Sequence, residues 1–235
     1  MIDILSICQE AADMTAAARP DDLFDKAVQH NAVFLSVAKT ELDSLMRFGD
    51  WQALIKEASF YTVSGKTFYA FDEIVLDFYA LVHNTIYVKD GLKKVIGALT
   101  SEDFMREKYF SNGGVEIAFK VENNGFRFLN DPGDGIQIVF MYRSNAVCID
   151  AKTLEPKSVL SKNTDVPIFD AYLVKLGIIW RFLKRSGLDY EEEYNEYQKE
   201  LKKRFGLETA PKDICLAKNE FNLDGNHAVQ IVFKG

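Results

Sequence analysis

The segment that most constrains the fold is residues 165–206, which has the pattern of two helices joined by a short turn. In its first half, large apolar residues recur every three or four positions, as in a helix with one broad buried face. Asp165 is expected to cap this helix ahead of Pro167, and Gly187 to end it in a left-handed conformation. The apolar residues are Phe169, Tyr172, Leu173, Leu176, Ile179, Trp180 and Leu183.

The second half of this segment is predicted to be a helix that begins after Asp189 and ends before Gly206. Its acidic start and basic end both oppose the helix dipole, which favours well-defined boundaries. Five residues form one stripe along it, and either core packing or a subunit contact would explain them. We single out Tyr194 and Tyr197 as candidates for a subunit interface. The charged residues are Glu191, Glu192, Glu193, Lys199, Lys202, Lys203 and Arg204, and the stripe is Tyr190, Tyr194, Tyr197, Leu201 and Phe205.

The first quarter of the chain is also predicted to be helical, with a short helix through Ile4–Ala12 and a longer one over residues 21–48 that stops at Gly49. The period then changes to two, which indicates strands. Hairpin turns are expected at Ser64-Gly65, at Asp90-Gly91 between strands 87–88 and 95–96, and at Asn123-Asn124-Gly125. Residues 136–142 are predicted to form a strand, and residues 101–110 a helix capped by Thr100 or Ser101. Residues 145–163 are predicted to be a loop or crossover.

These patterns predict an α+β protein in which an antiparallel β-rich region is inserted into a helical bundle built from both ends of the chain. The expected divisions are a helical body over residues 1–58 and 164–206, a β-rich insertion over 59–163 and an extended C-terminal tail over 207–235.

The composition fits a folded protein that carries a net charge of −7 over 235 residues. Such a charge disfavours binding to phosphate backbones, because that requires a basic surface. No apolar run approaches the roughly 20 residues that cross a bilayer, and the first residues lack the features of a signal peptide, so we expect a chain that is made and kept in the cytoplasm, with no membrane partner. The spacing of Cys8, Cys148 and Cys215 predicts buried thiols.

No motif predicts a catalytic, cofactor or metal site. The loops 112–114 and 131–135 match no nucleotide-binding pattern, and the second lacks most ligands of a calcium loop, so an ordinary turn is the favoured interpretation. Glu191–Glu193 could hold a cation, but complementing the helix dipole explains them better. His30, His83 and His227 are isolated in sequence and are expected to have ordinary surface or core roles.

Two segments together carry a resemblance to a known family. They are RFGDWQALIKEASF at residues 47–60, after the long N-terminal helix, and LGIIWRFLK at 176–184 followed by GLDY at 187–190. With the order of helices and strands around them, they resemble head-to-tail adaptor proteins of tailed bacteriophages, broadly the tail tubular protein A type. The resemblance covers about residues 1–206. The sequence departs from the family where a Leu-Pro strand entry is expected, since residues 70–82 contain no proline.

The resemblance implies a structural virion protein, made in the bacterial host, that forms a ring, typically of 12 copies, under the portal. Such a ring joins the DNA-filled head to a tail or nozzle protein, and genomic DNA passes through it without sequence-specific binding. An acidic channel wall suits this passage because it repels the negatively charged DNA. The alternative is a hydrolase whose acids converge from the β insertion.

The C-terminal tail ends in an alternating pattern that has no obvious strand partner nearby in the sequence. We expect it to add a strand to a portal or to a neighbouring subunit. Deletion of residues 221–235 should then abolish portal docking in a pull-down and leave the monomer folded. The residues assigned to this docking are Phe221, Val229, Ile231 and Phe233.

Overall fold

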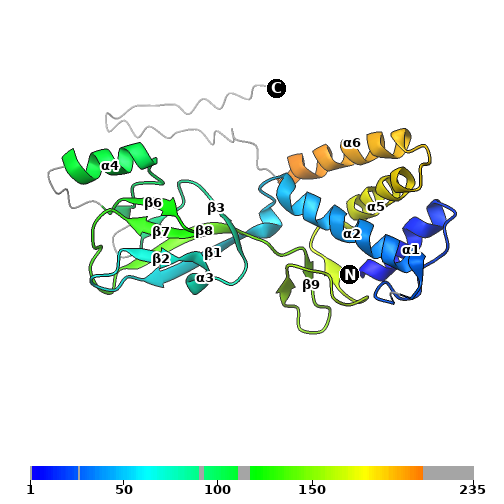
Figure 1. The fold of residues 1–235 in the computed structure, drawn as a ribbon, viewed down its shortest axis with the longest axis horizontal. Coiled ribbons are helices and arrows are strands. Elements are labelled where there is room, and N and C mark those ends of the chain that lie inside the picture. Colours follow the sequence, from blue (N-terminus) through cyan, green and yellow to red (C-terminus); the bar gives the residue numbers. More distant parts are fainter. Residues whose placement is uncertain (1, 26, 90–92, 111–116, 209–235) are drawn as a thin grey trace, which may run out of the picture.

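Two hydrophobic cores, one among helices and one between strands, lie at opposite ends of an elongated molecule (Figure 1). The computed structural model describes residues 2–25, 27–89, 93–110 and 117–208. We call the two parts the helical body and the β lobe. The predicted α+β class is confirmed, and the tail segment 209–235, with its four assigned docking residues, lies outside the described residues.

The helical body consists of α1 (Ile4–Met14), α2 (Gln29–Phe48), α5 (Ala171–Arg185) and α6 (Glu191–Glu208). Helix α5 is central, because α1, α2 and α6 all pack against it (Figure 1). Its buried face contributes Leu173, Leu176 and Ile179 to the core, as the apolar period predicted. Trp51, in the short link between α2 and the 3₁₀ turn η1 (Gln52–Leu54), is buried in the same core and donates from Nε1 to the Leu45 carbonyl over 2.7 Å.

The cap of α5 corrects the sequence prediction. Asp170, not Asp165, is the N-cap, and its carboxylate accepts from the backbone N–H groups of the next helical turn. Asp165 is fully buried, and it accepts from Lys157 Nζ at 2.6 Å as well as from two backbone N–H groups. Pro167 therefore lies in a strand rather than in a first helical turn. The helix does end as predicted, since Gly187 has a left-handed φ of 71°.

Two other helix boundaries differ from prediction. Helix α2 begins at Gln29 rather than near residue 21, because the side chains of Asp22 and Asp25 accept from backbone N–H groups two residues on and hold this segment in turns. It stops at Gly49 as expected, so at ~1.5 Å per residue its 20 residues span about 30 Å. Helix α6 continues through Gly206 to Glu208.

The β lobe contains two antiparallel sheets with a shared aromatic core. One has the order β1-β8-β4-β5, with β3 also paired to β8, and the other has the order β2-β7-β6. Helix α4 (Ser101–Phe110) flanks the lobe, capped by Thr100 as predicted (Figure 1). The elements are β1 (Ile55–Tyr61), β2 (Phe68–Ala70), α3 (Phe71–Ile74), β3 (Phe78–Leu81), β4 (Tyr87–Val88), β5 (Lys93–Lys94), β6 (Phe119–Glu122), β7 (Gly125–Phe128) and β8 (Gln137–Ser144).

One of the three predicted hairpins forms in full. Strands β6 and β7 pair across Asn123-Asn124, and both residues have positive φ, as a two-residue turn of this kind requires. Strand β4 pairs with β5 at 93–94 rather than with 95–96, because Ile96 instead bridges to Ala118. The predicted hairpin at Ser64-Gly65 is wrong: β1 pairs with β8 along its whole length of seven residues, a longer ladder than the three-residue β2 could offer.

The predicted loop at 145–163 is also wrong. It contains β9 (Cys148–Ile149) and β10 (Pro156–Lys157), which form a small sheet with β11 (Val166–Pro167) in the order β10-β9-β11. The strands are too short to show a period. Val147, Cys148 and Leu160 belong to the core of the helical body, so this part of the predicted β insertion packs with the helices.

Candidate functional site

The contact between α2 and α5 is built around a glycine. A Cβ on Gly177 would lie 2.1 Å from Cδ of Glu41, so only a residue without a side chain leaves room for this carboxylate. Glu41 is fully buried, although it occurs on a helix whose pattern gave no sign of a buried charge. The close approach of the two helices therefore places a carboxylate inside the helical body.

Glu41 is held by the next turn of α5. Arg181 donates from Nε to Glu41 Oε2 over 2.6 Å and from a terminal nitrogen to Ser44 Oγ over 3.0 Å. Burial raises the pKa of Glu41 above its usual range, against the opposing effect of Arg181. Glu41 Oε1 has no hydrogen-bond partner among the described residues. The bonds to Glu41 and Ser44 hold Arg181 where its guanidinium lies over the ring of the neighbouring Trp180.

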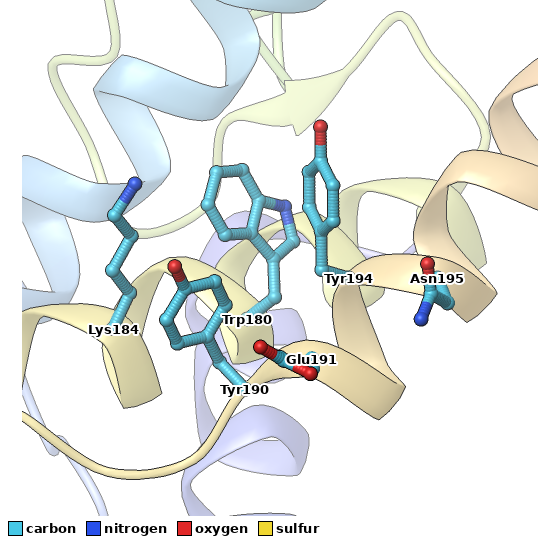
Figure 2. A pocket seen from close by; sticks show the side chains of 6 residues that line it. All are labelled: Trp180, Lys184, Tyr190, Glu191, Tyr194 and Asn195. Carbon is cyan, nitrogen blue, oxygen red and sulfur yellow. The ribbon is translucent and has the colours of Figure 1, made fainter.

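Trp180 stands at the centre of an aromatic and cationic cluster on the outer side of α5 (Figure 2). Its ring lies 5.0 Å from that of Tyr194 in an edge contact and 5.9 Å from that of Tyr197. The Arg181 guanidinium lies over it at 4.4 Å, and Lys184 Nζ approaches both its ring and that of Tyr190. Trp180 is 8% exposed, yet its Nε1 donor has no partner among the described residues.

Two surface hollows adjoin Trp180. The aromatic hollow, of about 480 Å³, is lined by Trp180, Lys184, Tyr190, Glu191, Tyr194 and Asn195 (Figure 2). The basic hollow, of about 440 Å³, lies between α2 and α5 and is lined by Ser36, Val37, Thr40, Trp180, Arg181, Lys184 and Arg185. Because Trp180 and Lys184 line both, we call the two together the Trp180 groove.

The structure separates the two tyrosines that were candidates for a subunit interface. Tyr197 is 4% exposed and belongs to the core, where burial and the nearby Glu41 charge raise its pKa. Tyr197 therefore packs in the core of its own chain, on the side of α6 that faces α2 and α5, and does not form the predicted subunit contact directly. Tyr194 is 39% exposed and lines the aromatic hollow, so it stays a candidate.

Most of the other residues considered from the sequence stand apart from this groove, but Glu191 lines its aromatic hollow. Asp131 accepts from the backbone N–H groups of Gly133 and Gly65, and these bonds lower its pKa, as expected for an ordinary turn. His83 is exposed and His30 is half-buried, whereas His227 and the loop 112–114 lie outside the described residues. Glu191 and Glu192 are exposed at the start of α6 and Glu193 is half-buried there. Within the described ranges, no group of three His, Cys, Asp or Glu residues could hold a metal ion.

The predicted buried thiols are confirmed for two of the three cysteines. Burial raises the pKa of Cys8 to about 12 and that of Cys148 to about 11. Cys215 lies outside the described residues. A thiol with such a pKa is a poor nucleophile at neutral pH.

Asp77, an acid of the β lobe, has a structural role. Asp77 accepts from Lys56 Nζ at 2.6 Å, from the Tyr142 hydroxyl at 2.7 Å and from Ser144 Oγ at 2.6 Å. These contacts join β1 and β8 to the segment before β3. They occupy both carboxylate oxygens, so this acid gives no support to the hydrolase alternative.

No protein-family model matches the chain, and no curated protein matches it either. Across the described part of the chain, none of the helices has the length and apolar character needed to cross a membrane.

Proposed function

We propose that this chain is a head-to-tail adaptor of a tailed bacteriophage, a structural virion protein that forms a ring under the portal and connects it to a tail or nozzle protein. The proposal starts from the resemblance carried by residues 47–60 and 176–190. The observation that best supports it is the division of one elongated chain into two separately packed lobes (Figure 1). With two lobes, the chain can bind one partner through the helical body and another through the β lobe.

Exposed apolar side chains on both lobes agree with this role. In the β lobe, Tyr61 and Val63 are 62% and 53% exposed, and Leu76 is 97% exposed. In the helical body, Tyr194 and Leu188 are exposed near the turn between α5 and α6. Side chains of this kind are available for burial in a partner, and Tyr is among the residues enriched in protein interfaces.

The test is to mix the purified full chain with portal rings of tailed phages and to image the products by electron microscopy. A ring of about twelve copies, bound to one face of the portal, is the expected result. A chain that binds no portal, and that turns over ester, glycoside or phosphodiester probes in a way that depends on its β-lobe acids, would favour the hydrolase instead.

A further inference from the structure

Two sets of charges at the turn of the α5–α6 hairpin lack a counter-ion in the described chain. Lys184 and Arg185, at the end of α5, form no ion pair there, and neither do Glu191, Glu192 and Glu193 at the start of α6. Lys184 and Glu191 even line the same hollow without pairing. The ion pairs of these helices instead use residues such as Arg181, Lys203 and Arg204.

The Trp180 groove also has an unused donor. Nε1 of Trp180 is buried and has no acceptor in the described part of the chain, and Figure 2 shows the nitrogen on the side of the indole that faces Tyr194. A buried N–H without a partner is unfavourable. Since Tyr194 is partly exposed, rotation of its side chain would open this donor to an acceptor from another molecule.

The chemistry of the groove favours a carboxylate-bearing protein segment. Lys184 and Arg185 make the basic hollow cationic, whereas the chain as a whole carries a charge of −7, which opposes long-range attraction of nucleic acid. Trp180 is too deeply buried to stack on a base, which is how aromatic side chains usually contact single-stranded nucleic acid. The chain itself presents such an acidic segment in the first turn of α6.

We propose that the Trp180 groove of one copy binds the acidic first turn of α6, Glu191–Glu193, of a second copy. The carboxylates of Glu192 and Glu193 would pair with Lys184 and Arg185. The docking surface is the basic hollow of the groove, which contains none of these glutamates, so it differs from the acidic turn that it binds. Repeated from copy to copy, such a contact is head-to-tail, and head-to-tail contacts close into rings when the rotation between copies permits. The inference deepens the proposed adaptor role by naming the contact between ring subunits.

A charge exchange tests the contact. Self-association of the full chain is measured by sedimentation over a range of high protein concentrations. K184E/R185E and E192K/E193K should each weaken it at least tenfold, and an equimolar mixture of the two variants should restore it, since each acidic surface then meets a basic one. The control K199E/K202E makes the same charge change as K184E/R185E on exposed positions of α6 and should associate as the natural chain does.

A second measurement identifies the residues in contact. Copies with natural nitrogen and with ¹⁵N are mixed, treated with a carbodiimide that joins amines to carboxylates, and digested for mass spectrometry. Peptides that link Lys184 of one isotope to Glu192 or Glu193 of the other are expected. Absence of such links, failure of the variant mixture to associate, or binding of an oligo(dT) strand that K184E/R185E abolishes would overturn the inference.

The adaptor role is tested apart from this contact. A natural chain that binds portal rings while the charge exchange fails would keep its proposed function and lose only this subunit contact. If the chain binds no portal but the charge exchange succeeds, the contact stands without the adaptor role.

Discussion

At the scale of single residues, Gly177 and Glu41 depend on each other. The Gly177→Ala substitution would push a methyl group into the Glu41 carboxylate, which is fully buried and bonded to Arg181 and so has little room to move. We expect a loss of about 1–3 kcal/mol in the free energy of unfolding, measured by urea denaturation. Gly206→Ala is the matched control, because Gly206 is helical with open space around its Cβ position, and it should add about 0.5–1 kcal/mol. Equal effects of the two substitutions would contradict the proposed role of Gly177.

Asp165 gives stability a defined dependence on pH. Burial raises its pKa, but Lys157 and the backbone N–H groups of Ser161 and Lys162 outweigh that effect and leave the pKa below its usual value. The folded chain therefore binds fewer protons at Asp165 than the unfolded chain. Its contribution is complete above the unfolded pKa of about 3.9 and is lost as the pH falls through the lower folded value.

The variant Asp165→Asn should accordingly be less stable than the natural chain by about 2 kcal/mol at pH 7, because it loses a hydrogen-bonded charge. The difference should shrink as the pH falls below 4 in denaturant titrations. Asp13→Asn, at an exposed position of α1, should change stability by less than about 0.5 kcal/mol at either pH. A constant difference across the pH range would show that Asp165 acts by shape rather than by charge.

At the scale of elements, helix α6 has one side that builds the core and another that borders the Trp180 groove. Tyr197→Ala should lower the free energy of unfolding by about 3–5 kcal/mol, as for other buried aromatic residues. Tyr194→Ala removes mainly its edge contact with Trp180 and should cost about 0.5–1.5 kcal/mol. Thermal or urea unfolding of both variants measures this, and a loss at Tyr194 as large as that at Tyr197 would assign Tyr194 to the core as well.

The elements that the sequence predicted best are those specified by local signals. The apolar period of α5, the glycines at 49 and 187 and the Asn123-Asn124 turn all act within a few residues of where they stand. The pairing of β1 with β8 joins segments about eighty residues apart, so no local pattern could reveal it. The nearby Ser64-Gly65 suggested a hairpin that the longer ladder prevents.

The Trp180 groove was only partly predictable for a similar reason. The tyrosine stripe left core packing and a subunit contact open for this side of α6. It could not tell the buried Tyr197 from the exposed Tyr194, because both fall on the same helical period. Glu41 gave no signal at all, since a charge on a helix is usually solvated and only Gly177, on another helix, makes its burial possible. The smallness of Gly177 within an otherwise bulky helix face was the available clue.

At the scale of the whole molecule, the question is whether the two cores are cooperative units of their own. The aromatic core of the β lobe centres on Phe126 and Phe140, and the core of the helical body includes Leu173 on α5. Strand β1 follows directly on η1 and the buried Trp51, so the chain passes between the two cores with little sequence in between. Contiguous units of this kind can open separately in hydrogen exchange.

We expect Phe126→Ala, which removes about 3–5 kcal/mol of packing, to speed amide exchange throughout the β lobe while α1, α2 and α5 keep their protection. Leu173→Ala should do the reverse, loosening the helical body and the small β9–β11 sheet that packs with it. Hydrogen exchange read by mass spectrometry on both variants provides the comparison. If either substitution speeds exchange equally in both lobes, the molecule unfolds as one unit. In that case the two lobes of an adaptor would unfold together, so loss of the surface that binds one partner would also mean loss of the surface that binds the other.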